Sequence, residues 1–425
     1  MTTLRTAAAL AVTALVIAPA AASAAGDPLR DQQWNLDVVH ADAAHAISTG
    51  SGALVAVLDS GVQSSHPDLA GSVIDGHDFI DGDATPNDQE GHGTNVAGII
   101  VAHADNGIGI EGAAPGAKVL AIRVLDAANR GTTDEEAGGI DAAVAAGAQV
   151  INLSLSAGPS AVTTLLAGSS IVQAIERAAR AGVVVVAAAG NDGVPLCAQP
   201  LLATKILCVG AVNRSGHRAS YSNYAVRVDI VAPGGEPSVD EGITSAQLGG
   251  GFSAMAGTSQ ATPHVAAAAA LLVSLGLRGE AVINRLEQTA TDLGNPTLLG
   301  HGLLNMSAAV AGLGPSSAPA PQAPSAVGLT ARAAKRVRFG TVRRGGLAVV
   351  CTSPQAGVCS ARVTRGGRVL ARGSRPVAAG VSTTIRARLT AAGRREFARA
   401  RRIKARVTVS VPGVSAVHLA TTLLR

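Results

Sequence analysis

Short apolar runs alternate with alanine-rich stretches from about residue 53 to residue 290. Four runs are apolar without a period of two, which is typical of strands buried on both faces; they cover residues 53–59, 150–156, 183–191 and 206–212. Two of the stretches between them, residues 135–147 and 171–181, have the composition of helices. Strands and helices in alternation predict an α/β domain in three layers, with a mostly parallel sheet covered by helices on both faces.

The chain changes character after residue 313. Residues 314–326 are rich in Pro, Ser and Ala and lack bulky side chains, so they predict a linker. Beyond it, three runs alternate apolar and polar side chains as half-buried strands do, at residues 381–389, 404–411 and 414–424, and a short helix is expected near residues 390–400. We therefore expect a small all-β domain over residues 327–425, an Ig-like sandwich by length and pattern.

The two parts of the chain carry opposite charge. Residues 327–425 contain 21 Lys and Arg and one acid, Glu396, whereas the first 326 residues contain 13 basic and 28 acidic side chains. A basic domain attracts anionic polymers, so those of a cell surface are candidate partners. Since 19 of the 21 cations are Arg, the codon bias of a GC-rich genome is an equally open explanation of this basic charge. Aromatic residues are only 2% of the chain, which argues against a nucleic-acid reader built on stacked rings.

The N-terminus has the pattern of a secretory signal. Arg5 precedes an apolar run over residues 7–20, and Ala22-Ser23-Ala24 offers small residues at the spacing that a signal peptidase reads. The run is shorter than the roughly 18 residues of a membrane-spanning helix, so we expect no transmembrane anchor. Residues 1–24 are therefore predicted to be removed on secretion, leaving an extracellular or cell-wall-associated protein.

Secretion makes the four cysteines interpretable. Cys197 and Cys208 lie in the α/β part, and Cys351 and Cys359 lie in the basic part. An oxidising compartment favours disulfides, and two local bridges are the economical pairing. A zinc site is the weaker alternative, because neither pair has the short spacing that zinc sites use.

Three polar side chains stand where apolar segments end. Asp59 closes the first apolar run, His92 lies between two glycines, and Ser259 lies at the start of a long alanine-rich helix. Open α/β sheets place their sites at such ends. Asp, His and Ser on separate turns are the parts of a relay of orienting acid, base and nucleophile.

The motifs around these residues resemble one family, the subtilisin-like serine proteases or subtilases. They read DSGV from Asp59, HGTNVAG from His92 and GTSQATPHVA around Ser259, in the chain order that the family has. The segments APGAKVLAIRVLD, GVVVVAAAGND and SNYAVRVDIVAPG are similar to subtilase segments as well. The resemblance covers residues 27–313, implies a subtilisin-like fold with a catalytic domain over residues 25–313, and does not extend to the basic domain.

The resemblance assigns roles residue by residue. It makes Ser259 the nucleophile, His92 the general base and then the acid, and Asp59 the carboxylate that holds the imidazole. It makes Asn191 the side chain that donates to the oxyanion, for which an ordinary Gly-Asn turn is the alternative.

The resemblance also implies how the substrate is held. The strand end formed by Leu153, Ser154 and Leu155 is similar to the edge that pairs with an extended peptide. Such an edge reads the peptide main chain. Cleavage that depends little on sequence is therefore expected.

A calcium loop is a further implication. The segment ADNGIGI resembles the family's calcium loop, with Asn106 and the carboxylates of Asp27 and Asp68 as oxygen ligands. A glycine-rich loop held by its own hydrogen bonds is the alternative. Residues 107–112 also satisfy the pattern GxGxxG, but a helix is expected before them where a dinucleotide site needs a strand, so no nucleotide cofactor is expected.

Other positions are interpreted as structural or as departures from the family. His66 and His264 are expected to be structural rather than catalytic. Asn95 and Ser156 depart from the family pattern, which usually has His and Gly there, and Ser156 puts the preference of the primary specificity pocket in doubt.

The sequence thus predicts a secreted, calcium-stabilised serine endopeptidase that acts on protein or peptide substrates. An inactive subtilase scaffold, or a surface-binding module acting through its basic domain, is the alternative; the full set of four catalytic residues argues against inactivity. An α/β-hydrolase esterase is disfavoured, because a GxSxG turn around Ser259 is absent from the sequence.

Overall fold

The computed structural model describes residues 26–155, 170–197, 206–239, 241–314, 329–353, 357–377, 382–400, 402–411 and 414–424. The predicted signal at residues 1–24, Ser156, and the predicted linker after Gly314 lie outside these residues. Among the described residues, no helix is both long and apolar enough to cross a bilayer.

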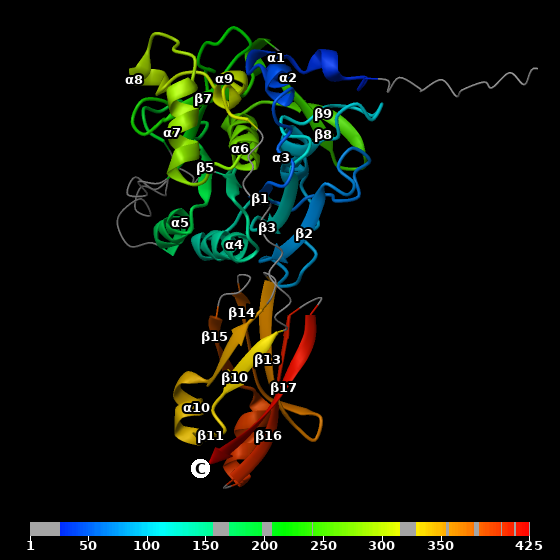
Figure 1. The fold of residues 1–425 in the computed structure, drawn as a ribbon, viewed down its shortest axis with the longest axis vertical. Helices are drawn as coiled ribbons and strands as arrows, with labels where there is room; N and C mark the ends of the chain where they lie inside the picture. The colour runs from blue at the N-terminus through cyan, green and yellow to red at the C-terminus, as the bar shows by residue number, and fades with distance from the viewer. Residues whose placement is uncertain are drawn as a thin grey trace, which may run out of the picture.

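A seven-stranded sheet forms the centre of the first part of the chain (Figure 1). Neighbouring strands of this sheet run parallel, and the strand order is β2-β3-β1-β4-β5-β6-β7. The strands are β1 (Leu54–Asp59), β2 (Val73–Asp78), β3 (Lys118–Arg123), β4 (Val150–Leu153), β5 (Val184–Ala188), β6 (Leu207–Val212) and β7 (Ile230–Pro233). The predicted parallel sheet is confirmed, although β4 ends earlier than the apolar run at residues 150–156.

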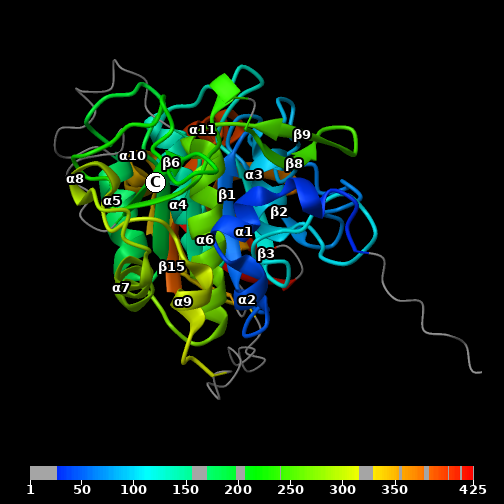
Figure 2. The ribbon, with the colours of Figure 1, turned by 90° about the horizontal axis from the view of Figure 1, so that it is seen from above.

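Helices cover both faces of this sheet. In β1, Val55 and Val57 pack into one core with α3 (His92–Val101) and α6 (Thr258–Ser274). Ala56 and Leu58 point the other way and pack with α4 (Thr133–Ala145) and α5 (Ser170–Arg180). Because both faces are buried, the strand stays apolar until Asp59. The three-layer prediction is confirmed: in Figure 1, α3 and α6 lie above the sheet and α4 and α5 below it, and Figure 2 looks down on the side that α6 covers.

Helix α6 lies inside the domain rather than on its surface. Its run of alanines at residues 266–270 is fully buried. Small side chains let a helix approach a sheet closely, so α6 crosses the domain with Ser259 held at its first turn. The helix packs against the sheet and begins at the edge of the sheet where the polar residues lie.

The remaining elements of this part are short. A hairpin pairs β8 (Ile243–Gln247) with β9 (Gly251–Met255) in the antiparallel sense. The other elements are η1 (Arg30–Gln32), α1 (Trp34–Val38), α2 (Ala41–His45), η3 (Pro237–Val239), α7 (Glu280–Thr289), α8 (Pro296–Leu299) and α9 (Met306–Val310).

The second part is all-β apart from two short helices. Its eight strands follow the order β10-β12-β15-β14-β13-β16-β17-β11 and enclose a core of their own. The elements are β10 (Thr330–Ala333), β11 (Arg336–Arg338), α10 (Phe339–Gly345), β12 (Leu347–Thr352), β13 (Gly357–Arg365), β14 (Arg368–Val377), β15 (Ser382–Leu389), α11 (Ala391–Arg399), β16 (Arg402–Val411) and β17 (Val414–Leu424). The predicted all-β domain is confirmed, and α10 was not predicted.

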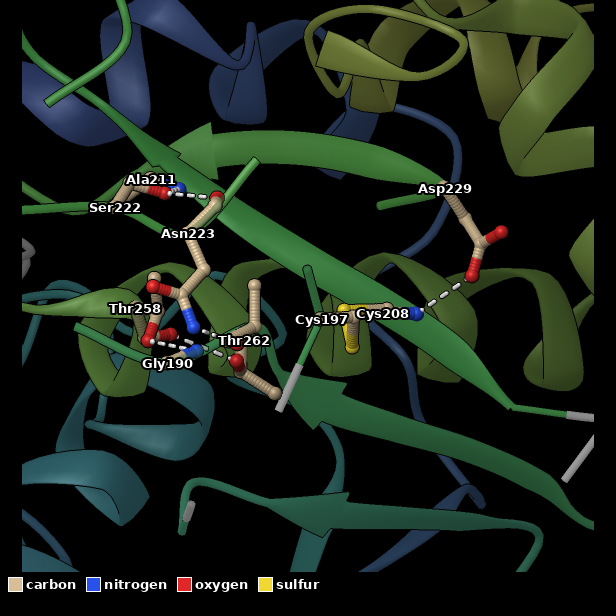
Figure 3. The surroundings of a disulfide bond; sticks show 10 residues. Gly190, Cys197, Cys208, Ala211, Ser222, Asn223, Asp229, Thr258 and Thr262 are labelled. Carbon is tan, nitrogen blue, oxygen red and sulfur yellow. Dashed lines mark hydrogen bonds between the residues drawn. A yellow bond between two sulfur atoms is a disulfide. The ribbon is translucent and has the colours of Figure 1, made fainter. Parts of the chain in front are cut away.

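Both predicted disulfides are present. Cys197 pairs with Cys208 on β6, and Cys351 on β12 pairs with Cys359 on β13. Figure 3 shows the first bridge, where Asp229 accepts a hydrogen bond from the backbone N–H of Cys208 at 2.8 Å. Each bridge closes only a short loop, so each adds local stability within its own domain.

Candidate active site

Asp59 and His92 meet at the carboxyl edge of the sheet. Asp59 ends β1 and is fully buried, and its Oδ1 accepts from His92 Nδ1 at 2.8 Å and from the backbone N–H of Ser60 at 2.7 Å. Among the described residues, Oδ2 of Asp59 has no hydrogen-bond partner. The carboxylate thus fixes the imidazole so that Nδ1 carries a proton and Nε2 faces outward as a potential base.

The turn before His92 is held by a residue that the sequence analysis missed. Asp88 accepts hydrogen bonds from the backbone N–H groups of Glu90, Gly91 and Thr94, and from the hydroxyls of Ser60 and Thr94. These bonds fasten the start of α3 to the end of β1. The only sequence signal was the Asx-turn pattern of an Asp two to three residues before a glycine.

Gly93 lets these two elements approach. A Cβ at this position would collide with the carbonyl oxygen of Gly61 and lie 3.0 Å from Cβ of Asp59. Gly91 has a φ of 107°, a left-handed conformation that favours glycine. Gly93 is therefore required by the close approach of α3 to β1, and Gly91 is favoured by its backbone conformation.

The environment of His92 favours its charged form. Burial lowers the pKa of His92, but the charge and hydrogen bond of Asp59, with the charges of Glu90 and Asp88, outweigh burial and raise this pKa to about 9. An imidazolium formed by proton transfer is stabilised here, which is what a general base in a buried site requires.

Ser259 lies in the first turn of α6 and lines the same groove as His92. Its hydroxyl donates to the carbonyl oxygen of Ser154 at 3.0 Å, and the hydroxyl of Ser154 donates to the carbonyl of Ser259 at 2.8 Å. No hydrogen bond between Ser259 and His92 is present among the described contacts. In this conformation the structure brings Ser259 into the groove with His92 but turns its hydroxyl toward β4.

Asn191 follows β5 and is oriented by the start of α6. The backbone N–H and the hydroxyl of Thr258 both donate to Oδ1 of Asn191 at 2.9 Å. Figure 3 shows Thr258 beside Gly190, whose N–H donates to the Thr258 hydroxyl at 3.2 Å. Because the amide oxygen is occupied by donors, the amide nitrogen is left to face the groove, where it can donate to an anion.

A groove of about 590 Å³ connects these groups. Among the predicted site residues, His92, Asn191, Ser154, Leu155 and Ser259 line it. The groove also includes residues that the sequence analysis did not single out, from the end of β3 to the start of α4, at 124–125 and 129–133, and Glu136.

Leu153 and Asp59 contribute from behind the groove. Leu153 is fully buried, and its side chain packs in the core under α4 and α5. Of the three residues predicted to hold the substrate, Ser154 and Leu155 line the groove and Leu153 does not.

The three predicted calcium ligands meet at the loop after α3: Asn106 belongs to this loop, Asp27 to the N-terminal segment and Asp68 to the segment before β2. The Asp27 carboxylate accepts from the backbone N–H groups of Asp105, Asn106 and Gly107, and Asp68 accepts from Nδ2 of Asn106 at 2.8 Å and from the N–H of Ile110. Burial raises the pKa of Asp68, and the negative charge of Asp27 adds to this rise. Oδ1 of Asn106 accepts from the N–H of Ile108 at 2.6 Å, so it is the nitrogen of this amide that faces Asp68. The two carboxylates are of the donor type that a hard cation prefers, and in this structure hydrogen bonds from the loop hold them.

A second acidic cluster contains Asp42, His45 and Glu111. Arg30 already forms ion pairs with Asp42 at 2.9 Å and with Glu111 at 3.4 Å, and His45 pairs with Glu111 at 3.0 Å. These cations neutralise the carboxylates, so the cluster is explained as an ion-pair network.

The other singled-out residues are buried and hydrogen-bonded. His66 contacts the carbonyl of Gly251 at 2.9 Å, and His264 contacts the carbonyl of Gln260 and the side chain of Asn35, both at 2.8 Å. Burial lowers the pKa of His264 to about 4, so it is neutral. Residues 107–112 follow α3 rather than a strand, in agreement with the rejection of a dinucleotide site.

Comparisons with known proteins agree with this arrangement. The profile of the Subtilase family, peptidase S8, matches residues 50–302. Thermitase of Thermoactinomyces vulgaris is 40% identical over 280 residues, which cover 66% of this chain and 96% of that protein. Subtilisin BL of Lederbergia lenta is 42% identical over 279 residues, which cover 65% of this chain and 97% of that protein.

Solved structures are similar over the same region. A protease from Pseudoalteromonas arctica PAMC 21717 is 32% identical with a TM-score of 0.61, and the match covers 67% of this chain and 98% of that one. A cold-adapted subtilisin-like serine proteinase gives 32% identity and a TM-score of 0.53, over 61% of this chain and 90% of that one. The family match, the relatives and the fold together place this chain in the subtilase family of serine endopeptidases.

Proposed function

We propose that this subtilase is a secreted endopeptidase that cleaves peptide bonds through an acyl-enzyme formed on Ser259. The observation that carries the proposal is the 2.8 Å hydrogen bond from His92 Nδ1 to the buried Asp59, at a groove that Ser259 also lines. That bond leaves Nε2 of the imidazole to act on the nucleophile.

In the first half of the reaction, the Ser259 hydroxyl turns from Ser154 toward His92. His92 Nε2 takes the hydroxyl proton while Oγ attacks the carbonyl carbon, and the carbonyl oxygen becomes an oxyanion. The amide of Asn191 and the backbone N–H of Ser259 donate to this oxyanion. His92 then gives its proton to the amine as the C–N bond breaks, which leaves an ester on Ser259.

In the second half, water attacks the ester. His92 takes a proton from the water as the second tetrahedral intermediate forms, and returns it to Ser259 Oγ as the C–O bond breaks. The products are a carboxylic acid and the free enzyme. Throughout, Asp59 stays ionised and stabilises the imidazolium, as the effect of its charge on the pKa of His92 supports.

We propose the following organisation for the full chain: residues 1–24 are a signal peptide, 25–313 the catalytic domain, 314–326 a linker, and 327–425 a basic domain. The separate cores of the described parts support the division. The oxidised cysteine pairs support secretion, since disulfides persist in oxidising compartments.

We further propose that Asp27, Asp68 and Asn106 hold a structural calcium ion. A bound divalent cation would supply positive charge between the two carboxylates and fasten the loop after α3 to the N-terminal segment. Support comes from the two carboxylates that meet at this loop and from the raised pKa of Asp68; Asn106 would offer Oδ1 once its amide turns from Ile108.

A second proposed function concerns the basic domain, which we propose binds an anionic cell-wall polymer. Arg362 on β13 lies directly opposite Arg372 on β14, and Arg372 lies opposite Arg388 on β15. All three are exposed, and like charges placed opposite one another destabilise a sheet. The domain's one acid, Glu396, is paired with Arg365 at 2.6 Å. Arg362, Arg372 and Arg388, here called the arginine row, offer a polyanion three neighbouring positive charges with no acidic residue among them.

The first prediction tests the nucleophile and the base. Ser259→Ala and His92→Ala should each lower kcat about a millionfold, the magnitude known for a subtilisin, and the double variant should cost little more because the two groups act as a unit. Asn191→Ala should lower kcat about a hundredfold to a thousandfold, because one oxyanion donor is lost. The measurement is hydrolysis of a peptide substrate, with fluorophosphonate labelling mapped by mass spectrometry. Labelling at a residue other than Ser259, or normal hydrolysis by Ser259→Ala, contradicts the proposal.

The second prediction concerns pH. His92 must be neutral to accept a proton, and Asp59 raises its pKa to about 9, so kcat/KM should rise with pH through an inflection well above the ordinary histidine value of 6.5. Asp59→Asn should move the inflection to lower pH and also lower kcat, because the charge that stabilises the imidazolium is removed. The measurement is kcat/KM from about pH 5 to about pH 11. A wild-type inflection at or below 6.5 would contradict the assignment.

The third prediction concerns calcium. A chelator should lower the melting temperature of the mature protein, because an ion bound only to the folded state adds about 2.7 kcal/mol at a concentration a hundred times its Kd. Asp68→Asn should lower the melting temperature similarly and abolish the response to the chelator. Asp75→Asn, at an exposed position on β2, is the matched control and should keep the response. Melting that is indifferent to both chelator and added calcium rejects the site.

The fourth prediction concerns the arginine row. The mature chain should pellet with anionic cell-wall material at low salt and release at high salt, whereas a chain ending at Leu313 should stay in solution. Replacing Arg362, Arg372 and Arg388 by Gln should weaken pelleting more than the same change at Arg336, Arg343 and Arg344, which removes equal charge outside the row. Equal pelleting of the full and shortened chains at low salt contradicts anchoring by this domain, and the codon-bias explanation predicts no retention at physiological salt.

A further inference from the structure

Glu136 is the acidic side chain that lines the groove together with His92 and Ser259. It is the last of three consecutive acids at the start of α4. Glu135 is used in the capping box of this helix, where it accepts from Thr132, and Asp134 accepts from the hydroxyl of Ser170. Among the three, only Glu136 lines the groove, so its carboxylate is available to whatever binds there.

Within the described part of the chain, no cation compensates this carboxylate. Among the described residues, Glu136 has no side-chain hydrogen bond or ion pair, and it is only partly exposed. Arg130 also lines the groove, but it is 77% exposed and pairs with Asp126 at 3.5 Å. The segment 156–169, which follows Leu155 and lies outside the described residues, contains no Lys, Arg or His.

Burial without a partner is costly for a charged carboxylate. Burial raises the pKa of Glu136 to about 8, and no nearby charge opposes that rise. A cation brought by a ligand would form an ion pair in a partly desolvated site, where such a pair is stronger than at an open surface.

The walls of the groove suit a long basic side chain. Leu125 and Leu155 give apolar surface, while Asn129, Thr132 and Thr133 give polar surface near the start of α4. Lys and Arg bury an apolar stem and keep a charged head group, and an Arg head group can bind a carboxylate through two parallel hydrogen bonds.

We propose that Glu136 is a specificity-determining residue that binds a Lys or Arg side chain of the substrate, a few residues from the scissile bond. The inference rests on the proposed endopeptidase function of the same groove. It modifies the expectation of cleavage that depends little on sequence, because main-chain pairing is now joined by one charge-selective contact.

The test uses the mature enzyme and a set of internally quenched peptides. The peptides share one neutral sequence, in which each position around the scissile bond is changed in turn to Lys, Arg, Gln, Leu or Glu. At one position, kcat/KM for Lys or Arg should exceed that for Gln by about tenfold, since a partly desolvated ion pair replaces an uncompensated carboxylate. Glu136→Gln should bring this ratio to within about twofold.

Asp134→Asn is the matched control. It removes one negative charge from the same helical turn without touching the groove, so it should keep the preference. Glu136→Lys should reverse the preference toward the Glu peptide, and labelling of Ser259 by a fluorophosphonate checks that each variant keeps its active site.

Three outcomes overturn the inference. They are cleavage by the wild type with no basic preference at any position, an unchanged preference in Glu136→Gln, and equal loss of preference in Asp134→Asn. Failure of the proposed endopeptidase function is distinct, because then no peptide is cleaved, the neutral one included, and Ser259 is not labelled.

Discussion

The parallel pairing of β1, β4 and β5 is the constraint on which the site depends. Parallel strands end at the same edge of a sheet, so Asp59 at the end of β1 and Asn191 after β5 are brought to one edge although 132 positions separate them in the chain numbering. Helices α3 and α6 begin at this edge, which adds His92 and Ser259. The helices on both faces bury the sheet, and a buried sheet holds this edge rigid.

Hydrogen bonds from residues outside the Asp59-His92-Ser259 relay fix the geometry of the segments that meet at this edge. Asp88 ties the His92 turn to β1, and Thr258 turns the Asn191 amide so that its nitrogen is left for the groove. Asp59 then sets the electrostatics, because its buried charge outweighs the effect of burial on the pKa of His92. Position and charge are thus controlled by neighbours that do not themselves react.

The two parts of the chain differ in charge and in architecture. The catalytic part is acidic and has its site in a groove, while the all-β part has a core of its own and carries exposed arginines in a row across three strands. The two cores are separate, although α4 of the first part contacts β14, the strand that carries Arg372.

The sequence by itself determined the α/β class, the basic all-β domain, the disulfide pairs and the three segments that meet at the site, because each depends on local pattern or on ordered motifs. It could not give the present orientation of the Ser259 hydroxyl toward Ser154, nor distinguish Glu136 from the two acids before it. Which of the three acids faces the groove depends on how α4 packs. Gly139 allows the helix to approach Leu58 and Val124, because a Cβ at this position would lie only 2.9 Å from each of these side chains. Such packing fixes the rotation of the helix and turns Glu136 toward the groove. Because this packing is made by contacts between segments far apart in the sequence, only the tertiary structure shows it.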